Sequence, residues 1–253
     1  MKKRKIVLPL FLSLSVLTSL AIHSTAVSAD VSVTEMEIKV SKGNTISVSR
    51  FNREAGKSLL WLPSEHGLTG GDKKITGQLA KLGFDVWVTD LLNSYFLVPA
   101  ASSIGKIPVS DIAGLLNQFL ANNKNQKIVL ASGRTAVVLL QALKASKRPA
   151  GVILISPNLY TGTPEPGSSA TYLPVTSQTN QNIKIFQPQL SPWYWQREAQ
   201  TGMLESGGSR VDVNVLPGVR DRFYFRPDAL ASEKKLQDDF PALISEAIKL
   251  ITR

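Results

Sequence analysis

The hydrophobic positions of the chain first alternate with polar positions and later gather into short continuous runs. Residues 35–40 and 45–49 each alternate apolar and polar side chains, and the segment between them contains Gly43 and Asn44. A period of two that is interrupted by turn-forming residues predicts an antiparallel β-hairpin. From residue 59 onward, apolar runs too short for helices are separated by segments with helical spacing.

Six of the later apolar runs predict buried strands, and the segments between them predict helices. The expected strands cover residues 59–63, 85–90, 128–131, 152–155, 183–186 and 211–215. The expected helices cover residues 75–82, 109–121, 135–146, a segment near 193–204, and 230–252, with a break near Pro241. Strands that alternate with helices indicate an α/β fold, in which helices cover both faces of a mostly parallel sheet.

One long segment, residues 161–182, follows neither pattern and is rich in Pro, Gly, Ser and Thr. It lies where a lid or cap could be inserted, and a plain surface loop is the alternative interpretation.

The first 29 residues have the layout of a signal peptide. A basic segment at residues 2–5 precedes an apolar run at 6–22 and small residues at 26–29. We expect cleavage after Ala29, a periplasmic or secreted location, and a single domain over residues 30–253. An uncleaved membrane anchor is the alternative, although the apolar run is slightly short for a span. No cysteine follows the apolar run, so no lipid anchor is expected.

Composition narrows the chemistry that this domain can perform. The absence of cysteine excludes disulfides, thiolate nucleophiles and thiolate metal sites. The formal charge of +10 falls to about +6 beyond residue 29, because 25 of the 29 basic residues remain against 19 acidic ones. These charges are scattered, so a nucleic-acid partner is not expected. No phosphate-binding glycine loop follows a strand and no metal-ligand spacing is present, so neither a cofactor nor a metal is expected.

Residues 128–136 (IVLASGRTA) read as an apolar strand, a sharp turn of small residues and the start of a helix. This is the layout of a nucleophile elbow, in which one small residue stands two positions before the nucleophile and another stands two positions after it. With Ser132 and Ala136 as the small residues, the central residue is Arg134. Arginine cannot form an acyl-enzyme, because its guanidinium stays protonated.

Three further segments strengthen a resemblance to the α/β-hydrolase superfamily. Residues 60–67 (LWLPSEHG) resemble the strand and His-Gly turn that supply part of its oxyanion hole, and 82–91 (LGFDVWVTDL) resemble its next strand. Residues 215–223 (VLPGVRDRF) resemble the segment around its catalytic histidine. The order of these segments, with an elbow after the third of the six later strands, supports the same resemblance.

The departures from this family pattern concern all three catalytic positions. The family's triad runs Ser, then Asp or Glu, then His along the chain. The elbow holds Arg134, residues 187–191 (QPQLS) hold no carboxylate, and the histidine position falls among Arg220, Asp221 and Arg222. The resemblance therefore implies a divergent, non-catalytic member, a pseudoenzyme that acts as a binding or partner-interaction module. A periplasmic protein is one expected kind of partner.

An enzyme remains the alternative interpretation. Ser132 and His66, the single histidine beyond the signal segment, are expected near the carboxyl edge of the sheet. Ser132 would be the nucleophile and His66 the base of a serine esterase, oriented by Glu65 or Asp90. The position of Ser132 before the turn apex also suits a hydroxyl that only caps the turn or helix.

The basic residues of these loops predict an anion-binding crevice. Arg134 at a helix N-terminus, together with Arg220, Arg222 and His66, would bind a small carboxylate, phosphate or sulfonate. In the alternative interpretation, Arg134 forms an internal salt bridge with Glu65, Asp90 or Asp221.

Two aromatic segments leave the same choice between ligand binding and packing. Residues 193–195 (WYW) and 222–226 (RFYFR) could stack on a ligand or pack within the domain.

Overall fold

The computed structural model describes residues 31–41, 43–52, 56–121 and 125–252. These residues belong to one compact unit, Val31–Arg253. The expected signal peptide lies outside the described residues and stays a prediction. Among the described residues, no helix combines the length and the apolar character needed to cross a membrane.

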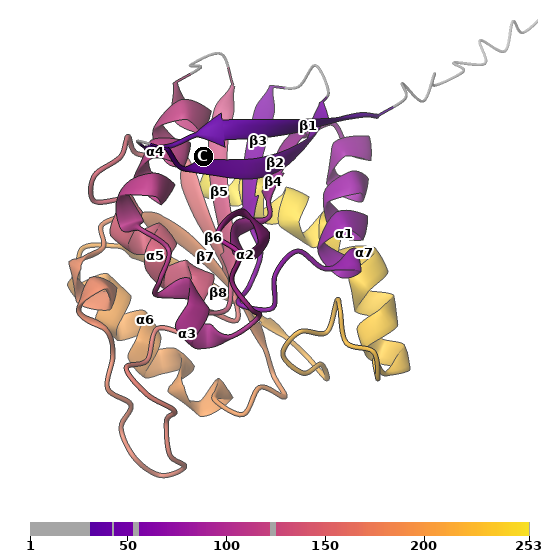
Figure 1. Ribbon diagram of the computed structural model, residues 1–253. Helices are drawn as coiled ribbons and strands as arrows, with labels where there is room; N and C mark the ends of the chain where they lie inside the picture. The colour runs from indigo at the N-terminus through magenta and orange to yellow at the C-terminus, as the bar shows by residue number, and fades with distance from the viewer. Residues whose placement is uncertain (1–30, 42, 53–55, 122–124, 253) are drawn as a thin grey trace, which may run out of the picture. The chain divides into compact units, whose positions relative to one another are not determined.

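A single eight-stranded sheet runs through this unit in the order β1-β2-β4-β3-β5-β6-β7-β8 (Figure 1). The strands are β1 (Ser32–Lys39), β2 (Thr45–Asn52), β3 (Lys57–Leu62), β4 (Asp85–Thr89), β5 (Gln126–Ser132), β6 (Gly151–Ile155), β7 (Asn182–Pro188) and β8 (Arg210–Leu216). β1 pairs with β2 and β2 with β4 in antiparallel fashion, whereas all other pairs are parallel. The predicted hairpin, the six later strands and the mostly parallel sheet are confirmed.

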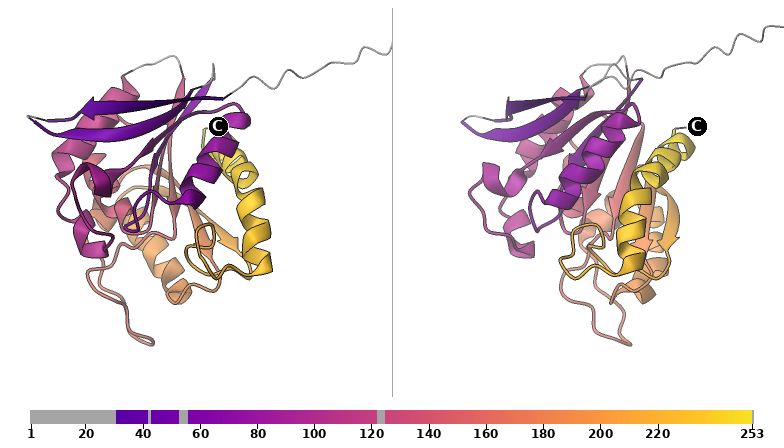
Figure 2. Two further views of the ribbon diagram at one scale, coloured as in Figure 1. Left: turned by 45° about the vertical axis from the view of Figure 1, so that its right-hand side comes forward. Right: turned by 90° about the vertical axis from the view of Figure 1, so that its right-hand side faces the viewer.

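Helices pack on both faces of the sheet, as the apolar runs require. Leu60 and Leu62 of β3 belong to one hydrophobic core, and Leu59 and Trp61 belong to the other. Because successive strand residues point to opposite faces, such a strand must be covered twice. The first core includes α4 (Val109–Leu120) and α5 (Thr135–Ala142), and the second includes α1 (Gly70–Lys81) and α7 (Ala231–Ile251) (Figures 1 and 2).

Several helix boundaries differ from the expected ones for local reasons. α1 begins at Gly70 because Thr69 and Asp72 form a capping box there. The aromatic segment near 193 forms a 3-10 turn, η2 (Tyr194–Gln196), before α6 (Arg197–Ser206). Two short helices, α2 (Leu91–Ser94) and α3 (Ala101–Ile104), were not expected, because four residues carry too little periodicity to detect.

The expected break near Pro241 is wrong, since α7 continues through this residue. Pro241 is buried in the helix interior, next to the core residue Phe240. A proline costs a helix its own N–H bond, and we infer that the packing of this face on the sheet offsets that loss.

The long irregular segment is partly structured. Tyr160 and Tyr172 form an antiparallel bridge across it, and the 3-10 helix η1 (Pro174–Gln178) precedes β7. These contacts favour a surface loop that is held against the domain over a freely moving lid.

Candidate functional site

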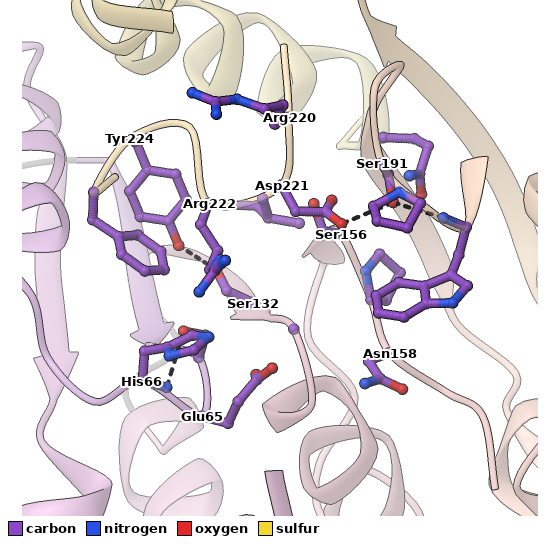
Figure 3. Close-up of a pocket in the computed structure, with 18 of the residues that line it drawn as sticks. Glu65, His66, Ser132, Ser156, Asn158, Ser191, Arg220, Asp221, Arg222 and Tyr224 are labelled. Carbon is purple, nitrogen blue, oxygen red and sulfur yellow. Dashed lines mark hydrogen bonds between the residues drawn. The ribbon is translucent and has the colours of Figure 1, made fainter. Parts of the chain in front are cut away.

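A pocket of about 330 Å³ lies at the carboxyl ends of the parallel strands. The loops that follow β3, β5, β6, β7 and β8 all contribute to its lining. In open parallel sheets these loops meet at one edge, which is where ligands usually bind. Figure 3 shows Glu65, Ser156, Asp221 and Tyr224 around the pocket.

The turn between β5 and α5 has its apex at Gly133. This residue directly follows the strand and has a left-handed backbone (φ 56°). A nucleophile elbow holds its central residue in a strained turn of this kind between strand and helix. The apex is therefore one residue earlier than the sequence predicted, and Arg134 is the residue after it. Because only glycine adopts positive φ without steric cost, Gly133 was the available signal for this position.

The carboxylate of Glu65 occupies the space next to this apex. Its Oε2 accepts a hydrogen bond from the backbone N–H of Arg134 at 2.8 Å. A Cβ atom built on Gly133 would lie 2.3 Å from the same oxygen. Glu65 thus occupies the space that a side chain at position 133 would need. Its carboxylate also accepts the backbone N–H of the next residue, Arg134. A negative charge is favourable there, because the start of α5 carries a partial positive charge.

The guanidinium of Arg134 is held by the chain itself. Its Nη1 donates to the side chain and carbonyl of Asn158 and to the carbonyl of Tyr160. The structure therefore places Arg134 beside the pocket lining rather than at its centre. The expected salt bridge with Glu65, Asp90 or Asp221 is not formed among the described residues; Glu65 meets the backbone of Arg134 instead. Burial lowers the pKa of Arg134, and the nearby charge of Glu65 raises it.

Ser132 and His66 both line the pocket, but different neighbours hold them. Ser132 is 3% exposed, and its Oγ accepts a hydrogen bond from the Tyr224 hydroxyl at 3.0 Å. The imidazole of His66 packs against the ring of Phe225, with 5.7 Å between centroids. Within the described part of the chain, no hydrogen bond links Ser132 to His66. Asp90 caps α2 through the N–H of Asn93 and does not line the pocket.

Asp221 presents a second carboxylate from the loop after β8. Its Oδ2 accepts a hydrogen bond from the Ser191 hydroxyl at 2.8 Å. Burial raises the pKa of Asp221, and the charge of Glu65 acts in the same direction, whereas Ser191, Ser156 and Arg222 lower it. Ser156 lies close enough to lower the pKa of this carboxyl, but neither its buried hydroxyl nor the buried Oδ1 of Asp221 completes a hydrogen bond of normal geometry within the described chain.

The two arginines of the same loop, Arg220 and Arg222, differ in whether a salt bridge already engages them. Arg220 pairs with Asp228 at 3.0 Å and with the fully buried Glu233 at 2.7 Å. This pairing lowers the pKa of Glu233 to about 2. Arg222 has a left-handed backbone (φ 63°), is exposed on the pocket rim and joins no salt bridge among the described residues. Of the predicted basic crevice, Arg222 and His66 are thus the side chains left to face a ligand.

Aromatic side chains form one wall of the pocket. Trp193 lines it and packs against Tyr160 with 6.4 Å between ring centroids, and Tyr160 packs on Tyr172 at 5.3 Å. Trp193 therefore both packs and faces the pocket. Tyr194 lies instead under the guanidinium of Arg197.

A metal centre finds no support in the part of the chain that the structure describes. No group of three or more His, Cys, Asp or Glu side chains there has a geometry that could hold an ion. The pocket residues that the sequence did not single out are Gly133, Ser156 and Ser191. Only the turn glycine carried a local signal, since the others are brought together by loops far apart in the chain.

Comparison with solved structures identifies the architecture as the α/β-hydrolase fold. An esterase from Pyrobaculum calidifontis superposes with a TM-score of 0.63 at 15% identity, covering 86% of this chain and 84% of that one. A carboxyl esterase from the fungus Tuber melanosporum gives 0.63 at 11% identity, covering 90% of both chains. An esterase from Pyrococcus furiosus gives 0.61 at 13% identity, covering 87% and 92%. No protein-family model matches the sequence, and no curated protein matches it significantly.

Proposed function

We propose that this chain is an exported ligand-binding protein that uses the α/β-hydrolase fold without acyl-transfer chemistry. The observation that carries this proposal is the position of Glu65. Its carboxylate lies 2.3 Å from where a Gly133 side chain would begin and accepts the N–H of Arg134.

Two requirements of acyl transfer would be lost by this arrangement. A serine hydrolase needs a nucleophilic side chain at the apex of the elbow, and glycine has none. It also needs the N–H of the following residue to stabilise the oxyanion, and that N–H already bonds to Glu65. A carboxylate in this place would repel a developing oxyanion. The remaining pocket of about 330 Å³ is at the lower end of the size range for small-molecule sites, roughly 300–1,000 Å³.

Ester hydrolysis through Ser132 and His66 is the second candidate function. The names of the structural neighbours favour it, because several of those proteins are esterases. The hydrogen bond from Tyr224 and the 3% exposure of Ser132 weigh against it, because a nucleophile must reach its substrate.

Turnover of short-chain aryl esters separates the two candidates. If the protein binds ligands without acyl transfer, the purified protein should hydrolyse these esters no faster than buffer alone does. Ser132→Ala and His66→Ala should then be indistinguishable from the wild type. Turnover that falls at least about a hundredfold in both variants would support the esterase instead.

Export rests on the N-terminal segment and is tested separately. Residues 1–29 fused to a reporter that is active only outside the cytoplasm should give signal, and replacement of Lys2, Lys3, Arg4 and Lys5 by Glu should abolish it.

A further inference from the structure

The two carboxylates of the pocket differ from the neighbouring Asp228 and Glu233 in forming no salt bridge among the described residues. Glu65 and Asp221 belong to loops 156 positions apart in the sequence, yet both line the same pocket, and the charge of Glu65 raises the pKa of Asp221. Among the described residues, neither takes part in a salt bridge, whereas nearby Asp228 and Glu233 are both paired with arginine. Carboxylates withdrawn from water and left without a positive partner destabilise a fold.

We propose that this pocket binds a small organic cation, whose ammonium group lies between Glu65 and Asp221 and whose apolar part contacts Trp193. This inference rests on the proposed function, because it assigns the ligand class of the same pocket.

Both carboxylates line the pocket and keep part of their hydrogen-bonding capacity. Asp221 accepts one hydrogen bond, from Ser191, through Oδ2, whereas its Oδ1 is buried and completes none within the described chain. Glu65 receives one, from the N–H of Arg134. An ammonium group has three donors and no acceptor, so it can bond to several such oxygens at once. In Figure 3 the carboxylate of Glu65 points toward the pocket, and that of Asp221 points toward Ser156 and Ser191.

The aromatic wall fits the same kind of ligand. Trp193 lines the pocket, and the adjoining ring of Tyr160 backs it. Aromatic faces attract cations, tryptophan most strongly, and they also cover the apolar part of a small ligand.

The positive charges expected to bind an anion are largely engaged elsewhere. Arg134 donates to Asn158 and Tyr160, and Arg220 is paired with Glu233. The N–H at the start of α5 that an anion would use is already bonded to Glu65. Arg226 also lines the pocket but is paired with Asp228. Arg222 is therefore the opposing arginine without a salt bridge among the described residues, and its exposure on the rim lets water screen it.

A matched set of probes tests the charge preference directly. Phenethylammonium, 3-phenylpropanoate and 2-phenylethanol share an aromatic ring on a short chain and differ in charge. Binding is measured by calorimetry and by the fluorescence of tryptophan at millimolar probe concentrations. The proposal expects the cation to bind at least about tenfold more tightly than either other probe.

Charge-neutralising variants locate the site. Asp221→Asn and Glu65→Gln keep side-chain shape and should each weaken the cation about tenfold, whereas Arg222→Met should strengthen it. The exposed residues Asp239 and Glu205 supply the controls Asp239→Asn and Glu205→Gln, which should change nothing. Thermal unfolding of each variant shows whether it remains folded.

Three results would overturn the proposal: tighter binding of 3-phenylpropanoate, no binding of the cation, or cation binding unchanged in both pocket variants. Each leaves the absence of acyl transfer untouched. Conversely, ester turnover that depends on Ser132 would overturn the proposed function and leave the charge preference measurable.

Discussion

The strands of the central sheet carry a polar cluster at each end, and the two clusters are built differently. At the amino ends of β3, β4 and β5, Asp85 accepts two hydrogen bonds from Arg50, at 2.9 and 3.0 Å. Ser58 lies within hydrogen-bond distance of both Asp85 and Lys127. At the carboxyl ends, Glu65 and Asp221 face a cavity and form no salt bridge with an arginine or lysine side chain among the described residues.

The difference separates a structural role from a binding role. Charges that are buried and mutually paired hold neighbouring strands in register, and removing one partner leaves the others uncompensated. Charges that line a cavity and keep free hydrogen-bonding capacity are available to a ligand. The same sheet therefore has a closed polar end and an open one.

The largest effect is expected at the closed end. Asp85 is 3% exposed, so Asp85→Ala leaves Arg50 and Lys127 without their carboxylate and should cost about 3 kcal/mol of unfolding free energy. Chemical denaturation measures this loss, with Asp239→Ala at an exposed position as the control. Equal stability of the two variants would mean that the paired cluster contributes little.

A somewhat smaller loss is expected at the turn apex. Gly133→Ala forces a side chain into a positive φ and against the Glu65 carboxylate, which should cost about 2 kcal/mol. Glu65→Ala should relieve the clash, so the double variant should be more stable than the sum of the two single losses predicts. Strict additivity in this double-mutant cycle would show that Glu65 does not occupy the apex in solution.

Ser132→Ala should cost about 1 kcal/mol, because the buried hydroxyl of Tyr224 would lose its acceptor. Denaturation of this variant is compared with Ser169→Ala at an exposed position. A loss no larger than in the control would mean that Ser132 is not held by Tyr224 and is free for another role.

The smallest expected effect is a change in the pH dependence of stability. The pKa of Asp221 is raised on folding, so ionisation disfavours the folded state. The favourable contribution of the protonated Asp221 carboxyl to stability is fully present below its unfolded pKa of 3.8. This contribution is lost as pH rises through the folded pKa. Asp221→Asn should therefore gain stability relative to the wild type as pH rises through this window. A difference between the two that stays constant with pH would contradict the raised pKa.

The fold could be predicted from the sequence because each strand carries its own signal. The alternating run before residue 50 and the continuous apolar runs after it follow directly from which faces of each strand are covered. The continuity of α7 through Pro241 could not be predicted, because the packing of Phe240 and its neighbours on the sheet outweighs a local preference.

The site could be predicted only in part. The sequence predicts the elbow segment but puts its apex at Arg134 instead of Gly133, because the pattern of small residues fits both registers. The contact between Glu65 and the N–H of Arg134 joins residues 69 positions apart. No local pattern records such a contact, nor the meeting of Ser191 with Asp221.

Fluorophosphonate labelling tests the absence of acyl-transfer chemistry most directly, since these probes react with activated serine nucleophiles. The purified protein is incubated with the probe beside an active α/β-hydrolase esterase as a positive control, and modified peptides are identified by mass spectrometry. The account predicts labelling of the control and none of this chain. Stoichiometric modification of Ser132, abolished by Ser132→Ala, would contradict it.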